Sequence, residues 1–501
     1  MCGIAGVWGT PATAEDAKLV DRMMASLAHR GPDAAGKFAN EHGTLGHRRL
    51  SIMDPAGGDQ PIRSDTGRAI VCNGEIYNLP EIRRSLAGRY CFHTGSDTEA
   101  ALHLYDAEGV TLPTSLDGMF AFVIADGKHL YAARDPVGIK PLYVAKDDGR
   151  LLFASELKAF PSRVSRAQEF PAGTWFHSET GFQPYYELPE HEPNPQSQAD
   201  PDALALAVRA TIEDAVQKRL MSDVPVGAFL SGGLDSGIVT AIARQHVSEL
   251  HTFSVGFAGS DDLEAARYLS RILDTVHHEY VLNENEILAK LPEILYHLES
   301  FDLDLVRSAI PCYFTARLAS DYVKVILTGE GADELFAGYA YYKDYTNRAK
   351  TLQDELRRSV GSMHNINLQR VDRMTMAHCV EGRVPFLDLS MIDLAFRIPA
   401  ELKLYPAPSP KATEKWILRK ACEDLLPADI LWRRKAQFDE GTGIVERMGA
   451  ILRGFIADVE PAAPARNSEE QVYLDIFVRQ FSNPHLLVGH VRRWADESSR
   501  L

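Results

Sequence analysis

Short apolar stretches alternate with turns rich in Gly, Asp and Asn through the first part of the chain, up to residue 187. Examples are GTLGHRRLSIM at 43–53 and RAIVCNGEIYN at 68–78. Apolar runs bounded by such turn residues are typical of strands in antiparallel sheets. Two longer segments, 14–29 and 97–107, have the spacing of helices. We therefore expect an α+β region with antiparallel sheets and a few helices.

The second part of the chain alternates strands with helices. Strand-like segments at 226–230, 251–257 and 324–329 each precede a turn and a helical stretch, the second of them near 262–273. This alternation is typical of an α/β fold, because parallel strands need crossover connections. Residues 370–501 have a mainly helical pattern. We expect an α/β domain with a parallel sheet here.

A polar, proline-rich run separates the two parts. Residues 188–203 read LPEHEPNPQSQADPDA and contain no apolar period. Such a composition predicts an exposed linker. The predicted domains are therefore residues 2–187 and 204–501, and a chain of 501 residues is long enough for two apolar cores.

The charge balance argues against general nucleic-acid binding, which depends on basic surface. The chain has 53 Lys and Arg against 69 Asp and Glu, a net charge of −16. No apolar run approaches the roughly 20 residues that span a bilayer, and the first residues lack the basic region of a signal peptide. The six cysteines include no CxxC pair, so no zinc or redox motif is indicated. We expect a cytoplasmic enzyme without membrane or nucleic-acid partners.

Cys2 is the cysteine whose position indicates chemistry. It follows the initiator Met and precedes Gly3, and a small second residue allows Met removal. The thiol would then lie beside a free α-amino group, whose pKa is about 7.7–8.0. That amine can act as the general base for the thiol, so no histidine partner is required.

Four polar clusters follow Cys2, each beside a glycine or a turn, where side chains and backbone amides can converge on a ligand. Together with Cys2 they resemble the class II, Ntn-type glutamine amidotransferase domain over residues 2–187. The resemblance implies an Ntn-hydrolase sandwich with antiparallel sheets between helices. The clusters are HRGPD (29–33), HRRLSI (47–52), CNGEIYN (72–78) and TGSDTEA (94–100).

The resemblance also implies a role for particular residues. The thiol would attack the side-chain amide of glutamine, with Asn73 and Gly74 donating hydrogen bonds to the oxyanion. Arg49 would bind the glutamine carboxylate in bidentate fashion. Asp97, helped by Glu75, would bind the ammonium group. Taken alone, Arg49 or Asp97 would be interpreted as a surface charge.

A second chemical motif, SGGLDS, lies at 231–236, directly between a predicted strand and a helix. Its glycines allow the backbone to approach an anion, Ser231 and Ser236 add hydroxyl donors, and the helix N-terminus adds a favourable dipole. The motif is not a Walker A loop, because it has no GK[ST]. It resembles the PP-loop of ATP pyrophosphatases.

A PP-loop binds the β- and γ-phosphates as the leaving group, so the resemblance implies attack at the α-phosphorus and an adenylate intermediate. Asp235 would bind Mg²⁺, the implied cofactor. The residues implied to bind ATP or its pyrophosphate are Leu230, Ser231, Gly232, Gly233, Asp235, Ser236, Val255, Gly256 and Gly329.

A third motif, TGEGADELFAGY at 328–339, contributes three carboxylates, among them Glu330 and Asp333. By themselves they would be interpreted as a solvated helix start. Beside a PP-loop, Asp333 is predicted as a second Mg²⁺ ligand and Glu330 as an acid/base group. Lys435 in WRRKAQF is predicted to neutralise charge on the α-phosphate and the leaving pyrophosphate.

With VEGRVPFLD at 380–388, residues 205–445 resemble the synthetase domain of glutamine-hydrolysing asparagine synthetases. The resemblance implies that glutamine hydrolysis supplies ammonia through a shielded apolar passage. The ammonia would attack an aspartate carboxylate that ATP has activated as its AMP ester. It also implies that glutamine, ATP and aspartate are the small-molecule partners and that the chain forms a homodimer.

The acceptor region departs from the family pattern. FDLDLVRSAIPCY at 301–313 places Asp302, Asp304 and Arg307 near the expected acceptor pocket. Arg307 is predicted to bind the acceptor carboxylate, whereas the two acids would favour a differently charged substrate. Gly382 stands where a larger residue is usual.

Alternatives therefore stay open. The main one is a specialised amidotransferase of the same family that amidates another carboxylic acid, for example in secondary metabolism. Ring-forming relatives such as β-lactam synthetases commonly lack the glutaminase cysteine, so Cys2 argues against them. SGGLDS argues against amidotransferases that make aminosugars or purine precursors, and the complete set of motifs argues against a non-catalytic protein.

Overall fold

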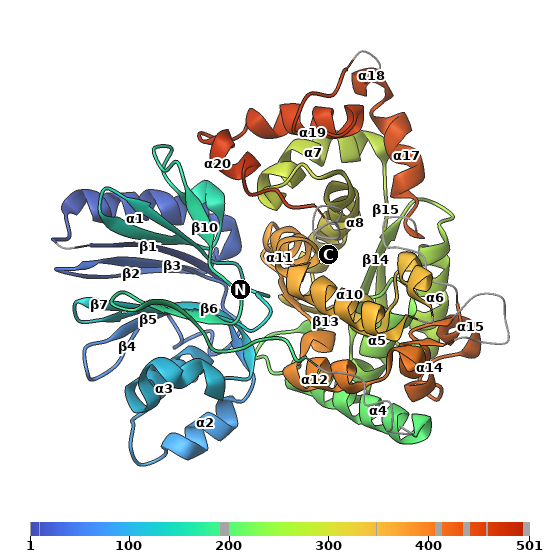
Figure 1. The fold of residues 1–501 in the computed structure, drawn as a ribbon, viewed down its shortest axis with the longest axis horizontal. Helices are drawn as coiled ribbons and strands as arrows, with labels where there is room; N and C mark the ends of the chain where they lie inside the picture. Colours follow the sequence, from blue (N-terminus) through green and yellow to red (C-terminus); the bar gives the residue numbers. More distant parts are fainter. Residues whose placement is uncertain are drawn as a thin grey trace.

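The structure is a computed structural model that describes residues 2–9, 11–190, 200–346, 348–405, 413–433, 441–456 and 459–493. The chain forms two lobes (Figure 1). The N-terminal lobe contains two antiparallel sheets, and the C-terminal lobe contains a parallel sheet among many helices. The expected combination of an α+β sandwich with an α/β domain is confirmed.

The two sheets of the N-terminal lobe face each other across an apolar core that includes Ile4, Leu45, Val71 and Val123. The first has the order β10-β8-β9-β1-β3-β2 and the second β12-β11-β7-β6-β5-β4. The strands are β1 (Gly3–Trp8), β2 (Ala34–Asn40), β3 (Gly43–Arg49), β4 (Ile62–Arg63), β5 (Ala69–Ile76), β6 (Gly118–Asp126), β7 (His129–Arg134), β8 (Tyr143–Asp147), β9 (Arg150–Ala154), β10 (Ala167–Glu169), β11 (Thr174–His177) and β12 (Gly181–Pro184).

Helices cover the outer faces of this sandwich, with α1 on the first sheet and α2 and α3 on the second (Figure 1). The predicted helix 14–29 ends at Ser26 and is followed by a short 3-10 turn, whereas the predicted helix 97–107 is found almost unchanged. The helical segments are α1 (Ala14–Ser26), η1 (Ala28–Arg30), α2 (Leu79–Leu86), α3 (Asp97–Glu108), η2 (Gly109–Ser115) and η3 (Leu157–Ala159).

The sheet of the C-terminal lobe has the order β15-β14-β13-β16-β17, and every pairing is parallel. Its strands are β13 (Val226–Phe229), β14 (His251–Gly256), β15 (Val276–Val281), β16 (Val325–Leu327) and β17 (Glu381–Arg383). The helices that connect and cover them are α4 (Pro201–Lys218), α5 (Leu234–His246), α6 (Asp261–Leu273), α7 (Glu284–Leu298), α8 (Leu303–Ser320), α9 (Ala332–Phe336), α10 (Ala349–Ser362), α11 (Asn367–Met376) and α12 (Leu389–Arg397).

The remaining elements are short and mainly helical, as the pattern after residue 370 predicts. They are η4 (Ala340–Tyr345), η5 (Met363–Asn365), η6 (Pro385–Leu387), α13 (Ala400–Lys403), β18 (Leu404–Tyr405), β19 (Thr413–Glu414), α14 (Trp416–Ala421), α15 (Ala428–Leu431), α17 (Ile444–Ile451), α18 (Arg453–Ile456), α19 (Ser468–Val478) and α20 (Pro484–Val488). No helix in the described ranges is long and apolar enough to cross a membrane.

Helix α4 begins at Pro201, inside the run that the sequence predicts as a linker. Asp200 caps it by accepting a hydrogen bond from the amide of Asp202, and proline suits the first helical position. Residues 191–199 of the predicted linker lie outside the described residues.

The two lobes share apolar cores. Leu19 and Met23 of α1 belong to the same buried cluster as Leu295 of α7 and Ile310 of α8. A second cluster joins Met119 of β6 to residues of the C-terminal lobe. The lobes are therefore held against each other by burial, and the division at 187 and 204 stays a prediction.

Candidate active sites

The first candidate site surrounds Cys2, which precedes β1. Its side chain is buried, and its main-chain nitrogen donates a hydrogen bond of 2.9 Å to Oδ1 of Asn73. Asn73 lies on β5 of the other antiparallel sheet, so the two sheets meet here. The Nδ2 atom of Asn73 is buried and has no hydrogen-bond partner among the described residues. A buried N–H donor beside a thiol is the arrangement that an oxyanion requires.

The surroundings of position 74, next to Asn73, admit only a glycine. Its φ is +154°, and a Cβ atom built there would lie 2.0 Å from the carbonyl oxygen of Met119. Any side chain would push β5 away from β6 and move Asn73 with it. The backbone at 73–74 is therefore held in one conformation, as a preorganised pair of donors needs.

Burial raises the pKa of the Cys2 thiol, although the positive charge at the N-terminus opposes this shift. The resting thiol is therefore neutral at pH 7 and needs a base to react. In a chain without Met1, the nitrogen that faces Asn73 is an α-amine and can accept the thiol proton. The carbonyl of Cys2 accepts a hydrogen bond of 2.9 Å from Nε of Arg30, so both ends of the residue are held.

Arg49, at the end of β3, is buried in the loop that follows it. Its guanidinium donates to the carbonyl oxygens of Met53, Asp54 and Pro55 and forms a 2.7 Å ion pair with Asp59. The carbonyl contacts fix the plane of the guanidinium, whereas the Asp59 side chain is 70% exposed. A substrate carboxylate can therefore replace Asp59 without disturbing the loop.

Two buried carboxyl groups, Asp97 and Glu75, lie against β5. Asp97 begins α3, and its Oδ2 accepts a 2.7 Å hydrogen bond from the amide of Ile76. Burial raises the pKa of Asp97 to about 6. Burial and the charges of Glu381 and Asp97 raise the pKa of Glu75 well above its usual range. A bound cation such as an ammonium group would relieve this repulsion.

The second candidate site is a cavity of about 500 Å³ at the carboxyl ends of β13, β14 and β16. Its place follows from the strand order, because the chain passes from β13 to one side of the sheet and returns on the other side with β16. Ligands of open α/β sheets bind at such a switch point. The predicted residues that line the cavity are Leu230, Ser231, Gly233, Asp235, Ser236, Val255, Gly329, Glu330 and Asp333.

The turn after β13 forms one wall of the cavity. The hydroxyl oxygens of Ser231 and Ser236 lie 3.0 Å apart, and the amide of Gly233 donates to Ser231. Gly232 has φ +70°, and a Cβ there would lie 2.5 Å from Ala265 of α6. The turn therefore stays narrow and presents amides, hydroxyls and the start of α5 to an anion. Gly232 in this turn and the predicted Gly256 at the end of β14 are not among the lining residues.

Sequence reasoning did not find Lys415, which joins the two predicted magnesium ligands. Its Nζ atom lies 2.6 Å from Oδ2 of Asp235 and 2.6 Å from Oδ1 of Asp333. The two carboxylates are therefore close enough to share one cation. Carboxylate oxygens are the ligands that Mg²⁺ prefers, so the donor set fits that ion. No motif marks Lys415, because the contact depends on how α14 packs against two distant strand ends.

Sequence reasoning also did not find Arg370 on α11, which donates a hydrogen bond to Oε2 of Glu330 inside the cavity. The predicted Lys435 lies outside the described residues. Within the described ranges, the cationic side chains that line the cavity are Arg370, Lys415, Arg419 and Arg433.

The predicted acceptor ligand Arg307 does not line the cavity. It lies on α8, and its guanidinium forms a two-point ion pair with Glu469 of α19, at 2.9 and 2.7 Å. Helix periodicity explains the difference, because Leu305, Ser308 and Cys312 occupy the face of α8 that meets the cavity. The structure therefore does not support Arg307 as an acceptor ligand.

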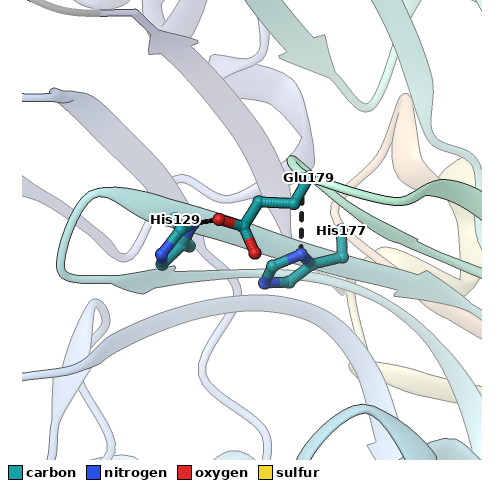
Figure 2. A group of neighbouring side chains, drawn as sticks. All are labelled: His129, His177 and Glu179. Atoms are coloured by element: carbon teal, nitrogen blue, oxygen red, sulfur yellow. Dashed lines mark hydrogen bonds and ion pairs between the residues drawn. The ribbon is translucent and has the colours of Figure 1, made fainter.

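One group in the described part of the chain has the donors and spacing of a metal site: His129, His177 and Glu179 (Figure 2). Glu179 lies 3.5 Å from Nδ1 of His129, and its amide donates to Nδ1 of His177. Two imidazoles suit zinc better than magnesium. None of the three lines the cavity, so this group is not the predicted magnesium site.

Comparisons with known proteins cover both lobes. The asparagine synthase family matches residues 207–354 and 344–494, and the glutamine amidotransferase domain family matches residues 1–174. Glutamine-hydrolysing asparagine synthetase 2 of Arabidopsis thaliana is 40% identical over 466 residues, which are 88% of this chain and 79% of that protein. The synthetases of Zea mays and Asparagus officinalis are 39% and 38% identical, over 88% of this chain and 78% of theirs.

Proposed function

We infer the reaction from one premise: the chain belongs to the family of glutamine-hydrolysing asparagine synthetases. We propose that it converts L-aspartate, L-glutamine, ATP and water into L-asparagine, L-glutamate, AMP and diphosphate, through a β-aspartyl-AMP intermediate. The observation that carries this proposal is that the SGGLDS turn, the Lys415 ion pairs and Glu330 line one and the same cavity.

The N-terminal lobe, proposed as the glutaminase domain, releases ammonia. The α-amine of Cys2 takes the thiol proton, and the thiolate attacks the glutamine amide. Nδ2 of Asn73 and the amide of Gly74 donate hydrogen bonds to the oxyanion. The α-ammonium group then returns the proton to the leaving nitrogen, so that ammonia departs and a thioester remains. Water then hydrolyses the thioester to glutamate. The buried donor of Asn73 supports this role.

Glutamine is oriented in this proposal by opposite charges at its two ends. Arg49 binds the α-carboxylate in place of the exposed Asp59 side chain. Asp97 and Glu75 bind the ammonium group. The raised pKa values of both carboxyl groups, which burial causes, support this assignment, because a bound cation stabilises the ionised form.

The C-terminal lobe, proposed as the synthetase domain, activates the acceptor carboxylate. The turn at 231–236 holds the β- and γ-phosphates as the leaving group, and Lys415 neutralises charge on them. Asp235 and Asp333 would hold Mg²⁺, which would supply positive charge to stabilise the leaving phosphates. Val255, which lines the cavity, is proposed to contact the adenine together with the neighbouring Gly256. Lys435 keeps its predicted role beside the α-phosphate.

Glu330 is proposed to accept a proton from ammonia as it attacks the adenylate. Its carboxylate faces the cavity and is held by Arg370. A carboxylate that is oriented before the reaction removes the proton without reorganisation of the site. The product amide and AMP then leave from the same cavity.

Aspartate is the proposed acceptor, and another carboxylic acid is the alternative that the cavity lining also accommodates. Asp302, the N-cap of α8, and Asp304 line the cavity, and Asp302 forms a 2.7 Å ion pair with Arg466. Arg307 is held by Glu469. Two acids at the acceptor end would favour an acceptor that carries a cationic group, which the α-ammonium of aspartate supplies. A longer amino acid with the same ammonium would meet the same residues.

Homodimerisation and a cytoplasmic location stay predictions.

An acceptor screen tests the proposal. Diphosphate release is measured with ATP, Mg²⁺ and glutamine against aspartate and a panel of other amino and carboxylic acids. Release with aspartate, together with formation of asparagine, supports the proposal. No release with aspartate but release with another acid would replace it with the alternative.

A further inference from the structure

Helix α11 forms a wall of the synthetase cavity on one side. Asn367, Arg370 and Val371 line the cavity, and Arg370 donates to Glu330. Asn367 donates hydrogen bonds to Glu334 and Tyr339 beside them. This side of the helix is therefore bound to the group that the proposed function assigns to proton transfer.

The opposite side of α11 holds the glutaminase lobe. Asp372 accepts hydrogen bonds of 2.8 and 2.9 Å from the two terminal nitrogens of Arg30. The remaining donor of that guanidinium, Nε, binds the carbonyl oxygen of Cys2 at 2.9 Å. Positions 370 and 372 are about 200° apart around a helix, so they face different lobes. Arg370 of α11 thus contacts Glu330 directly, whereas Asp372 of the same helix reaches Cys2 through Arg30.

The contact between Asp372 and Arg30 is buried on both sides. Burial opposes ionisation of Asp372, but the charge of Arg30 holds its pKa below the usual value. The pair belongs to a buried network in which positive and negative groups alternate across the lobes. Its further members, with Arg30 and Asp372, are Glu156, Lys158, Glu299 and Arg373. Removal of one partner from such a network leaves an uncompensated buried charge, which strongly disfavours separating its members.

We propose that Asp372 is a positioning residue for Cys2 and that α11 couples the state of Glu330 in the synthetase cavity to the rate of glutamine hydrolysis. The proposal rests on the proposed function. Glu330 changes its charge or its contacts when acceptor and nucleotide bind, and Arg370 carries that change to α11. A helix of this length moves as one body, so Asp372 and Arg30 then displace the carbonyl of Cys2 relative to Asn73.

The test measures the rate of glutamine hydrolysis by the full chain without and with ATP, Mg²⁺ and acceptor. The stimulation ratio is the rate with these ligands divided by the rate without them. The wild-type ratio is expected to exceed 1. In Asp372→Asn, Arg30 loses an anionic partner, so the ratio is expected to fall to 1 and kcat for glutamine hydrolysis to fall about 10- to 100-fold. Ammonia-dependent synthesis is expected to stay within about twofold, which shows that the chain is folded.

Arg370→Lys perturbs the same helix from the cavity side, where Arg370 donates to Glu330. It keeps the positive charge beside Glu330 but loses the planar guanidinium. Its ratio is also expected to fall to 1. If Asp372→Asn does not fold, this variant alone tests whether α11 couples the two sites. Gln369→Ala is the matched control on the same helix, since the Gln369 side-chain amide donates to the carbonyl oxygen of Leu298 and takes no part in the Arg30–Asp372 or Arg370–Glu330 pairs. Its ratio is expected to match that of the wild type.

A wild-type ratio of 1 overturns the proposal, as does a wild-type ratio in either Asp372→Asn or Arg370→Lys. A ratio that falls to 1 in Gln369→Ala as well also overturns the proposal, because the effect would then reflect general damage to the helix. Failure of the proposed function is a different result, namely no amide product from the wild-type chain with any acceptor. Glutamine hydrolysis by Cys2 and its response to ATP can still be measured in that case.

Discussion

The Nζ atom of Lys415 donates a hydrogen bond of 2.6 Å to Oδ2 of Asp235, a residue 180 positions earlier in the chain. The lysine is almost completely buried, and it also contacts Asp333. A positive charge between these carboxylates removes their mutual repulsion before any ligand binds. It is also placed to contact an anion in the turn at 231–236. We therefore expect several changes around this contact and around Cys2 to separate the two half-reactions.

Gly338 lies so close to Lys415 that a side chain cannot be added. A Cβ at 338 would be 2.0 Å from Oδ1 of Asp333 and 2.1 Å from Cε of Lys415. Gly338→Ala is expected to displace both charges and to lower ammonia-dependent synthesis about 100-fold, because displacements near 1 Å have effects of that size. Glutamine hydrolysis without ATP, measured as glutamate release, is expected to change less than about twofold.

Gly449→Ala is the matched control for that substitution, since a Cβ on this residue of α17 would meet no atom within 4 Å. Both half-reactions are expected to keep their wild-type rates. Equal loss of synthesis in the two variants would show that Gly338 has no particular role.

Cys2 and Asn73 are expected to act on glutamine alone. Cys2→Ala should abolish glutamine-dependent synthesis and leave ammonia-dependent synthesis nearly unchanged. Asn73→Ala should lower kcat for glutamine hydrolysis about 10²- to 10³-fold, the usual effect of removing one oxyanion donor. Product amide is measured with glutamine and with ammonium chloride as separate nitrogen sources. Loss of both activities in Cys2→Ala would contradict the division of labour between the lobes.

The raised pKa of Asp97 predicts that glutamine binding depends on pH. Burial raises its pKa to about 6, so the carboxyl group is neutral below that pH and cannot bind an ammonium group. KM for glutamine is therefore expected to rise as the pH falls from 7 to 5. KM for ammonia in synthesis serves as the comparison and should not follow the same curve.

The same shift has a consequence for stability. A carboxyl group whose pKa is raised on folding destabilises the folded state above that pKa, by about 3 kcal/mol for a rise from 3.8 to about 6. Below its unfolded value the effect vanishes. Asp97→Asn is therefore expected to raise Tm at pH 8 and to leave it nearly unchanged at pH 3, measured by calorimetry. A Tm that is lower at pH 8 would contradict the assignment.

Histidines at the contact between the lobes predict a loss of stability in acid. Burial lowers the pKa of His297 to about 2, and its ring lies 4.6 Å from that of His29. A histidine whose pKa is lowered on folding has no effect on stability above its unfolded pKa of 6.5, where it is neutral in both states, and it destabilises the folded state as the pH falls below 6.5. For His297 the loss by pH 5 is about 2 kcal/mol, or a few degrees in Tm.

His297→Phe is expected to reduce the fall of Tm between pH 7 and pH 5. The exposed His93 provides the control, because 56% of its side chain is accessible and His93→Gln should leave the pH dependence of Tm as it is in the wild type. An unchanged fall of Tm in His297→Phe would show that other groups control acid stability.

The sequence by itself determined the parts of this protein that depend on local pattern. Alternating apolar runs predicted the antiparallel sheets, strand–helix alternation predicted the parallel sheet, and SGGLDS predicted the anion-binding turn. These features can be recognised because periodicity, turn residues and a glycine-rich connection act over a few neighbouring positions. The position of Cys2 behind Met1 is likewise a fact of sequence.

Only the tertiary structure decided which distant side chains meet. Lys415 reaches Asp235, Arg370 reaches Glu330 and Asp372 reaches Arg30 because helices pack against strand ends and against the other lobe. Arg307 is the opposite case, since a turn of about 100° per residue takes it out of the cavity and into an ion pair with Glu469. The partner of a charged side chain is set by packing over long separations, which no local pattern records.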